Sequence, residues 1–206
     1  MALQFKRGRD PEAGPGMKYK ILIYGNSGAG KTWMAASAPR PLVLLTEQNG
    51  EQSTRLSNPD ARYVVVSTVA EVREIVARAT RGELGPPGDP VESLVIDGLT
   101  EVQRLFKDEM IANPTPGGPV LEMSIPMWGE LTEKMRRLLR TLRALPMHVV
   151  CTELADSEME GEKRHILPAF QGKKLYDEVM QYFNAVGYVE KVVDPKGGIQ
   201  NVANFD

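Results

Sequence analysis

A glycine-rich segment at residues 25–32 constrains the fold of this chain more than any other part of its sequence. The segment reads GNSGAGKT and follows the spacing G-x-x-x-x-G-K-[ST], with the apolar run Ile21–Tyr24 before it and a helical pattern after it. Glycines let the backbone curl until successive N–H groups point at phosphate oxygens, and the positive end of the following helix faces the same anion. At this spacing Lys31 reaches the β- and γ-phosphates of a nucleotide, and the Thr32 hydroxyl ligates magnesium. The sequence therefore predicts a loop that binds ATP and Mg²⁺.

The predicted nucleotide contacts extend one residue beyond this segment. They are Gly25, Asn26, Ser27, Gly28, Ala29, Gly30, Lys31, Thr32 and Trp33. Trp33 lies just inside the helix that follows the loop, and we expect its large ring to pack in the core.

Three acidic residues at the carboxyl ends of predicted strands are candidates to complete the site. Asp97 is the candidate metal partner of Thr32, because the carboxyl ends of buried strands meet where α/β proteins bind ligands; the alternative is an N-cap for the next helix. Glu47 is the candidate for orienting the attacking water, and the alternative is an exposed loop acid. Glu153 either senses the γ-phosphate or has no role at the site. The predicted catalytic residues are Lys31, Glu47, Asp97 and Glu153.

Short apolar runs alternate with longer amphipathic segments from Lys18 onward. The runs lack polar alternation, which is typical of strands buried on both faces of a mainly parallel sheet. The expected strands are Ile21–Tyr24, Leu42–Thr46, Tyr63–Val66, Ser93–Asp97, Met147–Thr152 and Ala185–Val193. The expected helices are Lys31–Ala38, Val69–Arg81, Thr100–Ala112 and Trp128–Leu145. The pattern predicts an α/β fold with a mainly parallel sheet flanked by helices and a C-terminal β-hairpin over Val192–Phe205.

Composition limits the class of protein and its partners. Residues 1–17 mix charges with glycine and proline, which favours a flexible N-terminal tail before one domain at residues 18–206. Hydrophobic residues make up 42% of the 206 and charged residues 25%, as in soluble proteins, and no apolar run approaches the ~20 residues of a membrane span. A single cysteine, Cys151, suits a buried side chain in a reducing cytoplasm. The net charge of −2 requires any nucleic-acid contact to rest on a local basic patch.

The order of these segments resembles the RecA-like ATPase core. A Walker A loop at 25–32 is followed by a strand before Glu47, a Walker B strand at 94–97, and a strand that ends at Glu153. More closely, the chain is similar to the small phage-encoded nucleotide-binding proteins grouped with the AAA ATPases, some of which are single-strand annealing recombinases related to RecA. The likeness spans residues 18–193 and is carried by Tyr24–Asn26, Leu44–Glu47, Ile96–Thr100 and Phe183–Tyr188.

The resemblance implies further roles. In RecA-like proteins a glutamate after the second strand activates water, which supports Glu47. A polar residue after the fourth strand, often glutamine, couples the γ-phosphate to a DNA-binding loop, and Glu153 departs from that pattern. The two DNA loops of the family correspond to 113–127 and 154–173, which show no clear helix or strand pattern.

Basic side chains in and beside the second loop are the expected contacts to single-stranded DNA, and a solvated loop is the alternative. They are Lys163, Arg164, Lys173 and Lys174. A second candidate surface is the helix face that carries Arg136, Arg140 and Arg143. RecA-like oligomers also place lysines of the C-terminal hairpin near a neighbour's phosphates, which implies a trans-acting role for Lys191 or Lys196.

The leading hypothesis is an ATP-dependent phage recombination protein that acts on single-stranded DNA in the host cytoplasm. It is expected to assemble as a ring or filament, with a single-strand binding protein as a further possible partner. The first alternative is a nucleotide-switched accessory protein that binds a replication or recombination partner without contacting DNA. A small-molecule phosphotransferase ranks last, because such an enzyme needs a second cationic lid over its acceptor.

Overall fold

The architecture follows from a computed structural model of the chain. It describes residues 17–47, 50–113, 122–160, 163–172, 175, 178–193, 195 and 197–205, without the side chains of 158–160, 163, 164 and 199. The expected tail therefore lies, except for residue 17, outside the described residues. The strands are β1 (Lys20–Gly25), β2 (Pro41–Leu45), β3 (Arg62–Val65), β4 (Ser93–Asp97), β5 (His148–Glu160), β6 (Lys163–Pro168), β7 (Ala185–Val193) and β8 (Ile199–Phe205). The helices are α1 (Lys31–Ala36), α2 (Gly50–Ser57), α3 (Val69–Arg81), α4 (Leu99–Ala112), α5 (Ile125–Ala144) and the short 3₁₀ turn η2 (Met180–Tyr182).

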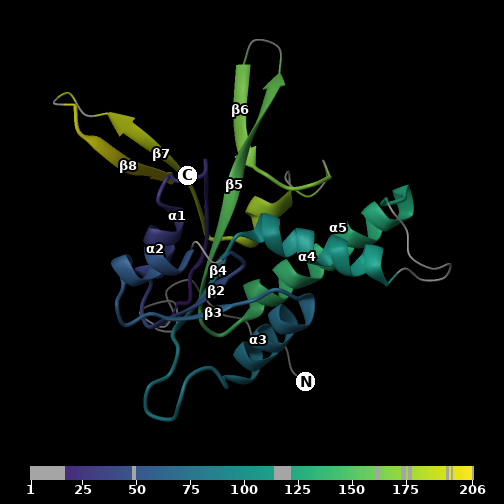
Figure 1. Cartoon of the computed structure of the whole chain (residues 1–206), viewed down its shortest axis with the longest axis horizontal. Helices are drawn as coiled ribbons and strands as arrows, with labels where there is room; N and C mark the ends of the chain where they lie inside the picture. The colour runs from purple at the N-terminus through teal and green to yellow at the C-terminus, as the bar shows by residue number, and fades with distance from the viewer. Residues whose placement is uncertain are drawn as a thin grey trace, which may run out of the picture.

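The sheet has the strand order β3-β2-β4-β5-β1-β7-β8 and is parallel from β3 to β7. Two antiparallel hairpins, β5–β6 and β7–β8, project from the body of the protein (Figure 1). The predicted α/β fold and its C-terminal hairpin are therefore confirmed.

Apolar side chains on alternate positions of each central strand divide the core into two clusters. Leu22, Leu94 and Ile96 face α3, α4 and α5, whereas Ile23 and Val95 face α1. Burial on both faces explains why the central strands read as continuous apolar runs. Helix α2 packs against α1. Within the part of the chain that the structure describes, no helix is long and apolar enough to cross a membrane.

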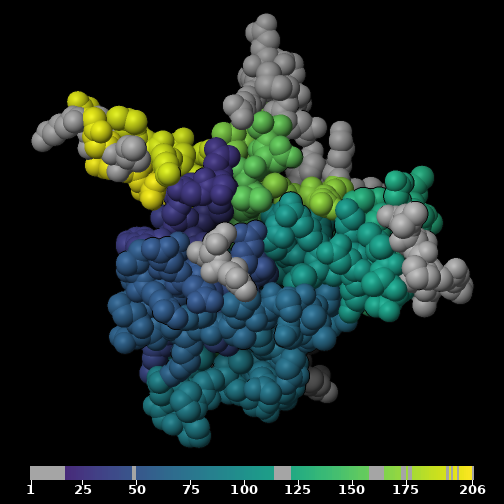
Figure 2. Space-filling model, in the orientation of Figure 1, coloured from purple at the N-terminus to yellow at the C-terminus, as the bar shows by residue number. Residues whose placement is uncertain are grey.

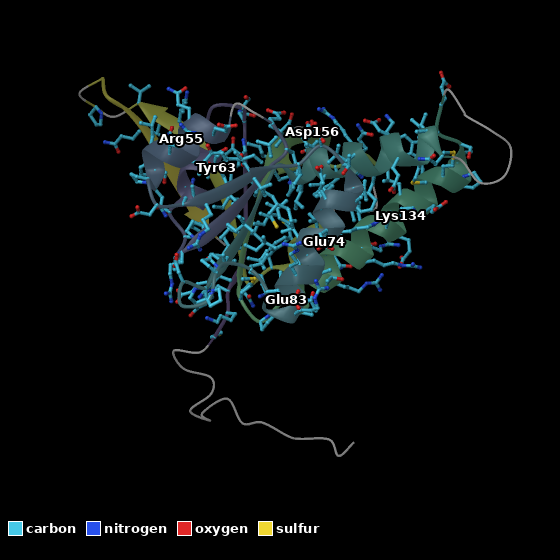
Figure 3. All side chains as sticks on the ribbon, turned by 60° about the horizontal axis from the view of Figure 1, so that its bottom comes forward. Arg55, Tyr63, Glu74, Glu83, Lys134 and Asp156 are labelled. Carbon is cyan, nitrogen blue, oxygen red and sulfur yellow. The ribbon has the colours of Figure 1, made fainter. Side chains whose placement is uncertain are left out.

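Helix α2 was not predicted, because its sequence GEQSTRLS contains one large apolar residue, Leu56, and that residue is 71% exposed. Polar contacts attach the helix to the sheet instead. The Arg55 Nε–H donates to the Tyr63 hydroxyl of β3 at 3.1 Å, and that hydroxyl donates to Glu51 at 3.3 Å (Figure 3). Hydrophobic periodicity cannot detect a helix that is held in this way.

The expected loop at 154–173 is instead largely a β-hairpin. Strand β5 continues past the sheet to Glu160 and pairs in antiparallel register with β6. The outer part of β5 reads ADSEME over residues 155–160, with Asp156 and Ser157 exposed, so the apolar runs used to find strands end before it. Helix α5 also begins earlier than predicted, at Ile125, because Pro126 fits the first turn of a helix.

Candidate nucleotide-binding site

The glycine-rich loop joins β1 to α1 at the carboxyl edge of the sheet. Gly28 and Gly30 adopt positive φ angles of 73° and 87°, which L side chains rarely adopt. Gly25 lies against β7, where an added Cβ would stand 2.3 Å from the Val189 carbonyl oxygen. These positions require glycine for conformation or for space, so the loop geometry that the sequence predicts is present.

Lys31 is held inside this loop. Its Nζ donates to the carbonyl oxygens of Gly25 and Asn26, both at 2.9 Å. Burial lowers the pKa of Lys31, and the acidic groups of Asp97 and Glu153 oppose that shift. The ammonium group therefore lies where it can turn from backbone carbonyls to phosphate oxygens.

Thr32 and Asp97 meet across α1 and β4. The Thr32 hydroxyl lies 2.9 Å from Asp97 Oδ2 and 3.0 Å from Oδ1, and the Thr152 hydroxyl donates to Oδ1 at 2.7 Å. Burial raises the pKa of Asp97, while hydrogen bonds from Thr152 and Thr32 act in the opposite direction. At nucleotide sites Mg²⁺ takes only a few ligands from the protein, and phosphate oxygens and water complete its octahedron. A hydroxyl and a carboxylate beside a phosphate loop are ligands of this kind. The residues present therefore fit the predicted metal.

Glu153 lies on β5, which stands in the sheet between β4, where Asp97 lies, and β1, which leads into the phosphate loop. The carboxyl group is fully buried and its Oε1 accepts the Thr100 hydroxyl and, at 3.1 Å, the Leu154 N–H. Oε2 has no hydrogen-bond partner among the described residues. Burial raises the pKa of Glu153 well above its ordinary value. The raised pKa favours the protonated form, and in that form the carboxyl group can donate a hydrogen bond from Oε2 into the site.

Glu47 follows β2 and is exposed at the rim of the site. It lines a cavity of about 410 Å³ together with Lys31, Thr32, Asp97 and Glu153. The structure therefore brings all four predicted catalytic residues to one cavity.

Trp33 also lines this cavity and is 54% exposed, so the expectation that its ring packs in the core is wrong. The first turn of α1 directs this side chain toward the rim of the site rather than toward the sheet. An exposed ring beside a phosphate loop can contact a bound nucleotide.

Three threonines complete the site that the sequence analysis found only in part. Thr152 bridges the Asp97 carboxylate and the Gly98 N–H, Thr46 donates to the Asp97 carbonyl oxygen at 2.8 Å, and Thr100 donates to Glu153. Thr46 directly follows β2, Thr152 ends the apolar run of β5, and Thr100 lies in the first turn of α4. Position at the end of an apolar run, or just after it, is the one sequence signal that could have identified them.

The predicted DNA contacts are only partly described. Lys163 and Arg164 lie on β6, where the backbone register places them opposite Glu160 and Met159. Their side chains, and Lys173 and Lys174 altogether, lie outside the described residues.

The alternative surface on α5 is engaged within the chain. Arg136 pairs with Glu178 at 2.6 Å, Arg140 pairs with Glu133 at 2.6 Å, and Arg143 donates to the Gln181 carbonyl oxygen at 2.8 Å. These contacts account for the arginines without nucleic acid.

A parallel sheet that carries a phosphate loop after one strand and an aspartate beside that loop at the end of another defines the class of P-loop nucleotide-binding domains. The family model described as AAA domain matches residues 17–206, so the chain belongs to this family. Among solved structures, the flagellar accessory protein FlaH from Methanocaldococcus jannaschii is similar at 14% identity and a TM-score of 0.48, over 93% of this chain and 80% of that chain. No curated protein matches the chain.

Proposed function

We propose that this chain hydrolyses ATP in the cavity between the P-loop and Asp97. Lys31 would bind β- and γ-phosphate oxygens, and Thr32 and Asp97 would hold Mg²⁺, which neutralises phosphate charge when it is bound. Glu47, exposed at the rim, would orient the attacking water. Glu153 would donate its proton from Oε2 to a γ-phosphate oxygen as a hydrogen bond. The observation that carries this proposal is the meeting of these groups around one 410 Å³ cavity.

We further propose that ATP controls binding of single-stranded DNA at the β5–β6 hairpin, in a phage recombination protein that assembles as a ring or filament. Support for control of the hairpin by ATP comes from β5, which runs without a break from the nucleotide site into the hairpin. Glu153 belongs to β5 itself, and the next residue, Leu154, accepts the Ala169 N–H at 2.7 Å just after β6. Thr100, which donates to Glu153, also lies 3.4 Å from the Ala169 carbonyl oxygen. A change in how Glu153 is bound would therefore act on both strands at the base of the hairpin.

A filter-binding assay with labelled single strands, with and without ATP, tests the DNA proposal. Each phosphate neutralised on a single strand contributes about 0.7 to the slope of log affinity against log salt concentration. If two of Lys163, Arg164, Lys173 and Lys174 contact phosphates, replacing all four with alanine should flatten that slope by about 1.4. The matched control replaces Arg78 and Arg81 on α3 and should leave the slope unchanged.

The second candidate is a nucleotide-switched accessory protein without DNA contact. The observations in its favour are the net charge of −2 and the exposed Asp156 on the outer part of β5 (Figure 3). A protein that binds ATP but fails to bind single strands at low salt in the same assay would support this alternative.

A further inference from the structure

The cavity around the P-loop holds more acidic groups than basic ones. Its described lining includes Lys31 as a cation, together with the acidic side chains of Glu47, Asp97, Glu101 and Glu153. ATP adds several negative charges at the same place. Even with Glu153 neutral and Mg²⁺ bound, one lysine leaves this site with little positive charge from the protein, so a second cation close to the loop would have a large effect on affinity.

Such a cation lies on the β7–β8 hairpin of the same chain. Lys191 Nζ stands 3.8 Å from the position of a Cβ on Gly28, in the middle of the P-loop. In Figure 2 the hairpin lies beside the segment that contains the loop and α1. Within the described chain no carboxylate forms an ion pair with Lys191, so its charge is available to a ligand.

The hairpin also fixes the position of this lysine. Lys191 and Asn201 are directly opposite each other in the antiparallel register, and such pairs present their side chains on one face. Asn201 Nδ2 stands 2.7 Å from the position of a Cβ on Gly30, and the Val189 carbonyl oxygen lies against Gly25. The hairpin therefore reaches the loop at Gly25 through a backbone carbonyl, and at Gly28 and Gly30 through two side chains of one face.

We propose that Lys191 is a second phosphate-binding cation supplied in cis, and that Asn201 positions the loop beside it. The resemblance to RecA-like oligomers implied a role for this lysine at a neighbour's nucleotide. The geometry points instead to the polyphosphate of its own subunit. The proposal rests on nucleotide binding at the P-loop and is independent of any DNA site.

Equilibrium titration of the full chain with fluorescent ADP and ATP analogues tests the assignment. Lys191→Met should raise Kd for both nucleotides three- to tenfold, and Lys191→Arg should restore most of the affinity. The matched control is Val192→Ala, because Val192 is the adjacent exposed residue on the other face of the hairpin. This substitution should leave Kd unchanged. An unchanged Kd in Lys191→Met would overturn the proposal.

Mixed subunits separate cis from trans action. At ATP concentrations below Kd, Lys191→Met should hydrolyse ATP more slowly than the parental protein, and mixing it with Lys31→Ala should not restore the rate, because each Lys191→Met subunit lacks its own cation. Recovery at any mixing ratio would show that the lysine acts on a neighbour and would refute the cis assignment. An unchanged Kd in Lys191→Met, or recovery on mixing, would leave single-strand binding by the parental protein unaffected. Failure of the Lys191 proposal is therefore distinguishable from failure of the DNA proposal.

Discussion

Replacing Glu153 with glutamine should change how the free energy of unfolding depends on pH. Burial of this carboxyl group holds its pKa well above the ordinary value, with smaller opposing effects from the Leu154 N–H and Lys31. Between the ordinary pKa of the unfolded chain and the raised pKa of the folded protein, the folded state binds one more proton than the unfolded state. The free energy of unfolding of the parental protein therefore falls as pH rises through this window.

The size of the effect follows from one proton. One pH unit within the window corresponds to about 1.4 kcal/mol, so the stability of Glu153→Gln relative to the parental protein should increase by about that amount for each pH unit between the two pKa values. Glutamine has nearly the same volume, and its oxygen can accept the Thr100 hydroxyl, so the loss of packing is small.

Urea denaturation at several pH values measures this difference. Glu153→Leu serves as the control, because it should show the same pH dependence with a different constant offset. A stability difference between Glu153→Gln and the parental protein that does not change with pH above the ordinary carboxyl pKa would refute a raised pKa at this position.

Two further changes test the site itself. Glu47→Gln should keep the parental ATP affinity while losing turnover in a phosphate-release assay, and hydrolysis at the parental rate would remove Glu47 from the role of orienting water. Gly30→Ala should lower the free energy of unfolding by at least about 1–2 kcal/mol, since it forces an L side chain into a left-handed conformation and against Asn201. Adding Asn201→Ala should recover part of that loss in the same denaturation assay, and full recovery would mean that backbone strain at Gly30 contributes nothing.

The sequence was most informative where local chemistry and strand order determine the structure. The P-loop needs glycines at fixed spacing, and Asp97 ends an apolar strand, so both could be located without coordinates. Because parallel strands end at one edge of the sheet, Glu47 and Glu153 could also be expected near the phosphate loop.

Other features depend on contacts between distant segments. Asn201 and Lys191 reach the loop only because β7 pairs with β1 and β8 turns back along β7. Trp33 carries a core-type side chain, yet its direction depends on where α1 begins relative to the sheet. The outer part of β5 and the start of β6 consist mostly of polar residues, so no continuous apolar run marks this hairpin in the sequence.

Titration of the protein with ATP, with and without Mg²⁺, tests the central claim most directly. Isothermal titration calorimetry should show one ATP bound per chain in the parental protein, tighter binding when Mg²⁺ is present, and a Kd at least tenfold higher in Lys31→Ala. Circular dichroism of Lys31→Ala should match the parental spectrum, because Lys31 makes its hydrogen bonds within the loop. Equal ATP affinity in the two proteins, or no binding by the parental protein, would contradict a nucleotide site on residues 25–32.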